Sequence, residues 1–140
     1  MDRILNYIDG QFVEPRQGRY LDNHRPMDGS VYAELPDSTT EDIDLAVQAA
    51  KRAFPAWRKL RRQQRADYLN RIADLIEADL EAFAAIESMD QGKTLQLARQ
   101  MDIPRAVENF RFFAGAILHQ EEKAFQTAPE ILNYTLREPL

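Results

Sequence analysis

The sequence contains no cysteine among its 140 residues. Without cysteine, the chain itself can form no disulfide bond, no thiolate metal site and no cysteine nucleophile. Its five glycines are scattered, so neither a GxGxxG motif nor a P-loop is present to hold a phosphate. The two histidines, His24 and His119, stand apart from any cluster of metal-binding residues. These absences exclude the common local devices of catalysis and phosphate binding from this chain.

An excess of positive charge and a long apolar run are also missing. The formal net charge is -5, with a pI of about 5.1, which argues against nucleic acid as the main partner. No apolar run is long enough to span a bilayer, and the first ten residues lack the basic and then apolar pattern of a secretory signal. We therefore expect a cytoplasmic protein with neither nucleic acid nor a membrane as partner.

Residues 1–37 are predicted to form two β-hairpins. The dipeptide Asp9-Gly10 lies between two short apolar runs, which is the strongest short-range signal for a hairpin. A second turn, at residues 26–29, separates residues 20–24 from residues 30–35, and the latter alternate between apolar and polar side chains as half-buried strands do.

The pattern in residues 38–120 changes to that of helices. Thr39 can cap the first helix, with Asp42 three residues later as its capping-box partner. Pro55 is expected to end this helix near Ala53, because the residue before a proline avoids the helical conformation.

A single second helix is predicted from about Arg62 to Ser88, with Gly92 supplying the left-handed residue that stops it. At 1.5 Å per residue its length would be about 38 Å, so it would pack along something larger than a compact domain of this size. We interpret the basic residues around its start as a solvent-exposed surface rather than a phosphate site: Arg58, Lys59, Arg61, Arg62 and Arg65.

Residues 94–100 are predicted to form a short helix, after which Asp102 caps a third long one with Pro104 in its first turn. This places Arg105 at the positive end of a helix, where the macrodipole disfavours a cation. The expected buried face of this helix is apolar: Ile103, Ala106, Val107, Phe110, Phe113, Ala114, Ile117 and Leu118.

Arg105 is the candidate binding residue, and its pattern leaves alternatives open. Its guanidinium could bind a carboxylate through two parallel hydrogen bonds. It could equally form a salt bridge with Glu108 or be an ordinary surface arginine.

The last segment, residues 121–140, is polar at first and then contains one predicted strand at residues 131–137. No partner for this strand is visible in the sequence, so we expect it to present an unpaired edge.

The chain resembles the start of the NAD(P)-dependent aldehyde dehydrogenase superfamily over its whole length. The resemblance rests on an ordered set of segments: NYIDGQFV, RPMDGSVYAELP, TTEDIDLAVQAAKRAFPAW, RADYLNRIADLIEADLEAFAAIESMDQGKT and YTLREPL. The segment DIPRAVENFRFFA is most similar to the branch that oxidises 2-aminomuconic and 2-hydroxymuconic semialdehydes. The resemblance implies an α/β fold in which residues 38–120 belong to the cofactor-binding domain and residues 121–140 begin an oligomerisation arm.

The resemblance also implies a set of roles. In the muconic semialdehyde branch the arginine of DIPR, here Arg105, binds the carboxylate of a small-molecule aldehyde substrate. The family often holds a structural monovalent cation through backbone carbonyls, which correspond here to Asn23, His24 and Asp90. NAD, or NADP, and the catalytic cysteine, glutamate and asparagine belong to parts of the family fold beyond residue 140. We therefore expect a fragment that is inactive alone and part of a homodimer or homotetramer in the complete enzyme.

Two other hypotheses remain open. The enzyme could oxidise an uncharged aldehyde such as betaine aldehyde. Alternatively, the chain could be a non-catalytic helical interaction module, which docking of residues 131–137 on its own helices would favour.

Overall fold

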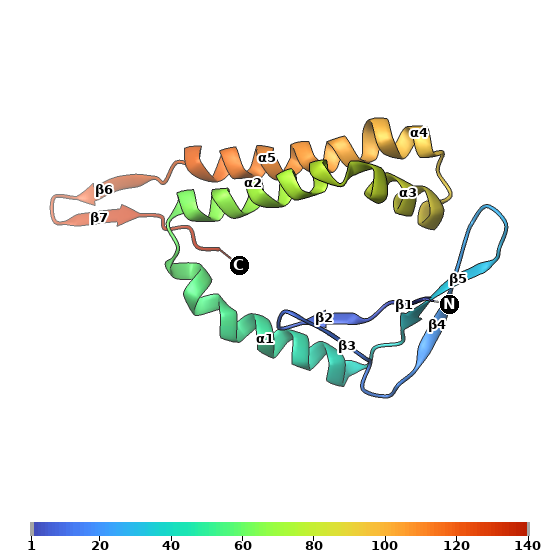
Figure 1. Cartoon of the computed structure of the whole chain (residues 1–140). Coiled ribbons are helices and arrows are strands. Elements are labelled where there is room, and N and C mark those ends of the chain that lie inside the picture. Colours follow the sequence, from blue (N-terminus) through green and yellow to red (C-terminus); the bar gives the residue numbers. More distant parts are fainter. Residues whose placement is uncertain (1, 140) are drawn as a thin grey trace.

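The computed structural model describes residues 2–139 and shows β-hairpins at both ends of a helical region. In Figure 1 the N-terminal strands lie beside α1, whereas α2 and α5 run side by side and the last hairpin extends beyond them. The helical elements are α1 (Thr40–Lys59), α2 (Arg62–Ala78), α3 (Leu80–Gln91), α4 (Leu95–Leu97), the π-helical turn η1 (Ala98–Asp102) and α5 (Ile103–His119). The strands are β1 (Asp2–Arg3), β2 (Asn6–Ile8), β3 (Gln11–Val13), β4 (Tyr20–His24), β5 (Val31–Pro36), β6 (Ala124–Ala128) and β7 (Ile131–Tyr134).

Both predicted N-terminal hairpins are present. Strands β2 and β3 are antiparallel and are joined by Asp9 and Gly10, whose φ angles of 55° and 78° match a two-residue hairpin turn. Strands β4 and β5 are also antiparallel, and β1 adds a short parallel pairing to β5 that the sequence pattern did not indicate.

A buried carboxylate fastens these strands to the start of α1. Asp42 is only 4% exposed, and its Oδ2 accepts a hydrogen bond from the backbone N–H of Thr39 at 2.8 Å, as the predicted capping box requires. Its Oδ1 accepts a second hydrogen bond from the backbone N–H of Arg16, also at 2.8 Å. One side chain thus caps the helix and holds the loop that follows β3.

The predicted end of α1 near Ala53 is wrong, since the helix continues through Pro55 to Lys59. The proline removes one amide donor and crowds the carbonyl four residues earlier. Beyond it, however, Trp57 packs on Tyr68 of α2 with ring centroids 5.6 Å apart. We infer that this contact offsets the local cost of the proline.

The predicted single helix from Arg62 to Ser88 is divided in two at Asp79, whose φ and ψ are −114° and 29°. Aspartate is a weak helix former because its side chain competes for backbone hydrogen bonds. The break redirects α3 so that Ala84 packs with Ala98 and Ile103 in a small core that Ile76 and Leu80 flank. Gly92 ends α3 as predicted, with a φ of 71°.

Helices α2 and α5 pack against each other mainly through small side chains. Ala66 and Ala73 of α2 are fully buried. Val107 and Ala114 of α5 are at most 3% exposed. The prediction that Phe113 belongs to the buried face is wrong, because 60% of its surface is exposed, and Leu118 is 37% exposed. Small residues facing α2 let the two helices approach closely and direct the large rings outward.

The predicted strand at residues 131–137 is shorter than expected and is paired. It forms β7, which ends at Tyr134 and lies antiparallel to β6, a segment we had predicted to be a polar connection. Phe125 and Thr127 favour an extended conformation, and Thr135 closes the hairpin by donating its N–H to the carbonyl of Lys123 at 2.9 Å. No helix within residues 2–139 combines the length and apolar character that crossing a bilayer requires.

The carboxylate of Asp42 gives a test of this architecture. Asp42→Ala should lower the midpoint of thermal unfolding by about 5 °C, because the backbone amides of Thr39 and Arg16 lose their acceptor. Asp44→Ala is the matched control, since this neighbouring carboxylate is exposed and accepts no hydrogen bond from the described residues. Equal effects of the two substitutions would contradict the role of Asp42.

The same carboxylate predicts a pH dependence. Hydrogen bonds from Thr39 and then Arg16 hold the pKa of Asp42 below its usual range. Its stabilisation should therefore be complete above the unfolded-state pKa of about 3.9 and be lost as the pH falls through the lower folded-state pKa. Unfolding curves of wild type and Asp42→Ala should converge in that acidic range.

Candidate functional site

The helix that carries Arg105 is continuous from Leu95 to His119, with a π-helical turn inside it. The prediction that Asp102 caps a new helix is wrong, because its φ and ψ of −69° and −50° are helical and its side chain accepts no capping bond. The helix begins instead at Thr94, whose side chain accepts a hydrogen bond from the N–H of Leu97 at 3.3 Å. Arg105 consequently lies well inside the helix, beyond the first turn where the macrodipole acts.

Pro104 explains the π-helical turn. A proline has no N–H to donate to residue 100, and its ring would collide with that residue's carbonyl in a regular α-helix. The wider turn relieves this clash, and the N–H of Ile103 bonds the carbonyl of Ala98 five residues earlier.

The wider turn also sets which way α5 faces. Five residues along a regular α-helix would place Ala98 and Ile103 about 140° apart. Both nevertheless pack in the same core cluster, since the π-helical turn absorbs the extra residue. With Ile103 and Val107 facing inward, Arg105 midway between them points away from α2.

The side chain of Arg105 is exposed and forms neither a hydrogen bond nor an ion pair with residues 2–139. The alternative salt bridge to Glu108 is therefore not formed in the described part of the chain. By contrast, Arg111, six residues further on the same helix, donates to Asp74 at 3.1 Å and to Glu77 at 2.5 Å. The guanidinium of Arg105 is thus available to an external anion.

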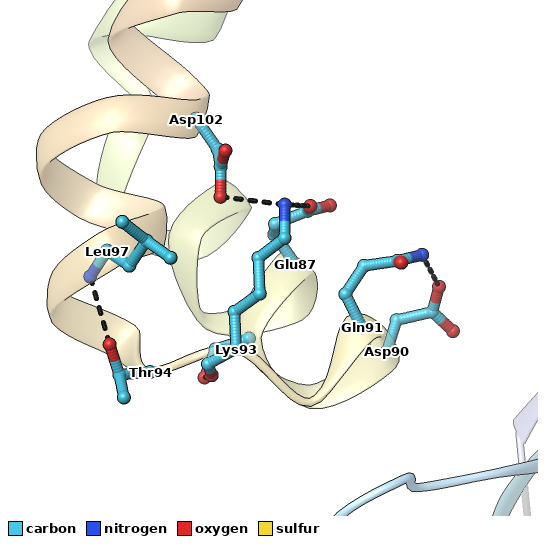
Figure 2. Close-up of polar contacts among 8 residues, drawn as sticks. Glu87, Asp90, Gln91, Lys93, Thr94, Leu97 and Asp102 are labelled. Atoms are coloured by element: carbon cyan, nitrogen blue, oxygen red, sulfur yellow. Dashed lines mark hydrogen bonds and ion pairs between the residues drawn. The ribbon is translucent and has the colours of Figure 1, made fainter.

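Lys93 links two acidic side chains beside this helix. Its ammonium lies 3.0 Å from Glu87 of α3 and 2.9 Å from Asp102 of η1, and Figure 2 shows it between the two carboxylates. Hydrogen bonds to Asp102 and then Glu87 raise the pKa of Lys93 above its usual value. Lys93 belongs to the segment ESMDQGKT on which the family resemblance rests, but no role was predicted for its side chain.

A second polar cluster joins the N-terminal sheet to α3. Asp90 Oδ1 accepts hydrogen bonds from the hydroxyl of Tyr32 and from Asn23 Nδ2, the latter at 3.0 Å. Tyr32 and then Asn23 lower the pKa of Asp90, and the Asp90 carboxylate raises the pKa of Tyr32. A Cβ at Gly92 would lie 2.9 Å from that of Pro26, so the sheet and helix approach closely here.

Two of the three residues expected at the cation site, Asn23 and Asp90, are in contact. Asn23 and Asp90 are brought together through their side chains, although the resemblance implied their backbone carbonyls. His24 follows Asn23 at an irregularity in the β4–β5 pairing, and its Nδ1 lies 3.1 Å from the carbonyl of Gly29. Residues 2–139 contain no group of three His, Cys, Asp or Glu residues that could hold a metal ion. A carbonyl site for a monovalent cation therefore stays a prediction.

Three of the five basic residues around the start of α2 have side-chain partners within residues 2–139. Arg58 forms an ion pair with Glu138, and Arg62 forms one with Glu122. Arg65 is 9% exposed and donates to the carbonyl of Leu60, so our interpretation of it as solvent-exposed is wrong. The acceptor is the carbonyl of Leu60, five residues before Arg65 in the connection between α1 and α2, and helical spacing alone does not predict this contact.

The described strands do not form a dinucleotide-binding site. Apart from the two-residue parallel pairing of β1 with β5, the sheets within residues 2–139 are antiparallel hairpins. Dinucleotide cofactors bind in the crevice of a larger parallel sheet, which this part of the chain lacks. A nicotinamide cofactor does not fit these residues alone.

Comparison with known proteins matches nearly the whole chain. The model of the aldehyde dehydrogenase family covers residues 12–140. The 2-aminomuconic semialdehyde dehydrogenase of Homo sapiens is 47% identical over 138 residues, which are 98% of this chain and 28% of that protein. The acetaldehyde dehydrogenase of Pseudomonas aeruginosa is 44% identical over 99% of this chain and 27% of that protein. The NAD+ complex of a Bacillus cereus aldehyde dehydrogenase has a TM-score of 0.89 at 34% identity, over 95% of this chain and 28% of its own.

The cluster at Asp90 can be tested by unfolding. Tyr32→Phe should lower the thermal midpoint by about 4 °C, because a hydrogen bond to a carboxylate is lost. Tyr20→Phe is the control, since the buried hydroxyl of Tyr20 has no hydrogen-bond partner among the described residues. In an Asp90→Ala background, Tyr32→Phe should have a smaller effect, because only the hydrogen bond that the hydroxyl accepts from Asn23 is then lost, and an undiminished effect there would contradict the pairing.

Proposed function

The chain belongs to the aldehyde dehydrogenase family, and we propose that it is the substrate-binding N-terminal part of an enzyme that oxidises a carboxylate-bearing semialdehyde. The proposed substrate is of the muconic semialdehyde type, and the product is the corresponding acid, with NAD or NADP as the oxidant. The chain spans only 28% of its human relative, so the remainder of the enzyme would hold the cofactor.

The observation that carries this proposal is the exposed guanidinium of Arg105, which has no ion-pair partner within residues 2–139. A guanidinium presents two parallel donors that match the two oxygens of a carboxylate. The name of the human relative, which is 47% identical, also favours a semialdehyde that carries acidic groups. Overall similarity alone does not decide the substrate, because the acetaldehyde dehydrogenase of Pseudomonas aeruginosa is 44% identical.

In the proposed enzyme, Arg105 orients the substrate from the end opposite the aldehyde. Binding the distal carboxylate restricts the substrate and so holds the reacting carbon in place. Residues 1–140 supply no cysteine nucleophile, since the sequence contains no cysteine. We therefore propose that this chain alone does not oxidise aldehydes.

The last hairpin supports a proposal for assembly. Phe125 of β6 and Leu132 and Tyr134 of β7 are each more than half exposed. An exposed apolar hairpin of this kind favours contact with another protein surface. We propose that it packs in a homodimer or homotetramer of a cytoplasmic enzyme. The alternative of a free-standing helical module gains no support from β7, because this strand pairs with β6 instead of docking on the helices.

The proposed cation site predicts a salt effect on the complete enzyme. If backbone carbonyls of Asn23, His24 and Asp90 bind a monovalent cation, the thermal midpoint should rise by a few degrees in potassium or sodium chloride, by about RT ln(1 + [L]/Kd) in free energy. Choline chloride at equal concentration is the control, since choline is too large for such a site. Equal midpoints in all three salts would contradict the site.

The role of Arg105 predicts a change in substrate preference. In the complete enzyme, Arg105→Met should raise KM for a muconic semialdehyde by about 10- to 100-fold, as expected for loss of a hydrogen-bonded charge pair, with a much smaller change for acetaldehyde. Arg111→Met is the matched control on the same helix, because Arg111 is already paired with Asp74 and Glu77. Equal changes for both aldehydes would contradict the role and favour an uncharged natural substrate.

A further inference from the structure

Asp102 and Arg105 lie one turn apart on the same helical face. Asp102 has helical backbone angles and α5 follows directly, so the two residues have the i and i+3 spacing at which helical side chains meet. The acidic residue precedes the basic one, which is the favourable order for such a pair along a helix. Local spacing alone would therefore predict an ion pair that occupies Arg105.

In the structure Asp102 pairs with Lys93 instead. Its ammonium lies 2.9 Å from Asp102 Oδ2, whereas Arg105 has no acidic partner within residues 2–139. The backbone of Lys93 is held in turn, because Ser88 Oγ donates to its carbonyl at 2.6 Å. Glu87 approaches the same ammonium from α3 at 3.0 Å, and Figure 2 shows both carboxylates converging on it.

We propose that Lys93 is a specificity-determining positioning residue: by holding Asp102, it keeps the guanidinium of Arg105 free for the carboxylate of the substrate. This inference rests on the proposed function of Arg105. It assigns the lysine no contact with the substrate, and it makes Asp102 a competitor that must be restrained.

Glu108 is the other acidic residue one turn from Arg105. It follows the arginine in the chain, which is the less favourable order for a helical ion pair. It is exposed and forms no ion pair with Arg105 in the described part of the chain. Asp102 is therefore the main competitor of the substrate carboxylate for Arg105, and Lys93 is the residue that pairs with Asp102 instead.

The test uses the complete enzyme and compares kcat/KM for a muconic semialdehyde with kcat/KM for acetaldehyde. The ratio of the two values cancels general losses of folded enzyme. Lys93→Gln should lower this ratio by about two- to threefold, the effect expected when an exposed one-turn ion pair competes for Arg105. The change should be in KM for the charged substrate rather than in kcat.

Two double variants separate competition from a simple change of charge. The wild-type cluster of Glu87, Lys93 and Asp102 carries one net negative charge. Lys93→Gln with Asp102→Asn and Lys93→Gln with Glu87→Gln both restore that net charge. The first should recover the wild-type ratio because the competitor is gone, and the second should not because Asp102 remains.

The outcomes distinguish this inference from the proposed function. If Arg105→Met lowers the ratio but Lys93→Gln does not, or if both double variants recover equally, the role of Lys93 is wrong and that of Arg105 stands. If Arg105→Met leaves the ratio unchanged, both proposals fail. In an Arg105→Met background, Lys93→Gln should no longer alter the ratio, and a continued effect would overturn competition as the mechanism.

Discussion

The π-helical turn at η1 is the constraint on which the arrangement of the candidate site depends. Pro104 cannot be accommodated in a regular helix without a clash, and the turn that accommodates it adds one residue between Ala98 and Ile103. Since both of these residues pack in one core, the rest of α5 has a single orientation. That orientation buries Val107 and Ala114 and leaves Arg105 in solvent.

The elements around this helix are connected by hydrogen bonds and ion pairs between side chains, and they enclose only a small apolar core. No large side chain within residues 2–139 is fully buried, and most of the buried apolar residues are alanines. Asp42 connects the first hairpin to α1, and Asp90 connects the second to α3. Lys93 then connects α3 to η1. The many exposed large apolar side chains support the proposal that these helices pack against further protein in the complete enzyme.

Local turn and capping chemistry made part of the fold predictable. The Asp9-Gly10 turn, the Asp42 capping box and the Gly92 helix stop each follow from a few adjacent residues. The errors occur where tertiary packing outweighs such signals. Helix α1 continues through Pro55, and we infer that the packing of Trp57 on Tyr68 stabilises it there. The break at Asp79 lets α3 pack in a core with Ala98 and Ile103, which lie later in the sequence.

The candidate site was likewise predictable only in part from the sequence. The family resemblance singled out Arg105, Asn23 and Asp90, whereas spacing alone left the arginine ambiguous and misplaced it at a helix end. In the structure Arg105 lies inside the helix instead of at its positive end, and it is notable because it has no ion-pair partner within residues 2–139. Lys93 lies in a segment that carries the family resemblance, but its pairing could not be predicted, because its two partners are six residues before it and nine residues after it.

The most direct measurement of the central claim is a crystal structure of the complete enzyme with a bound muconate-type dicarboxylate. The account predicts that both oxygens of the distal carboxylate lie within hydrogen-bond distance, about 2.7–2.9 Å, of the Arg105 guanidinium while Lys93 still holds Asp102. A carboxylate bound elsewhere, with Arg105 paired to Asp102 or Glu108, would contradict it.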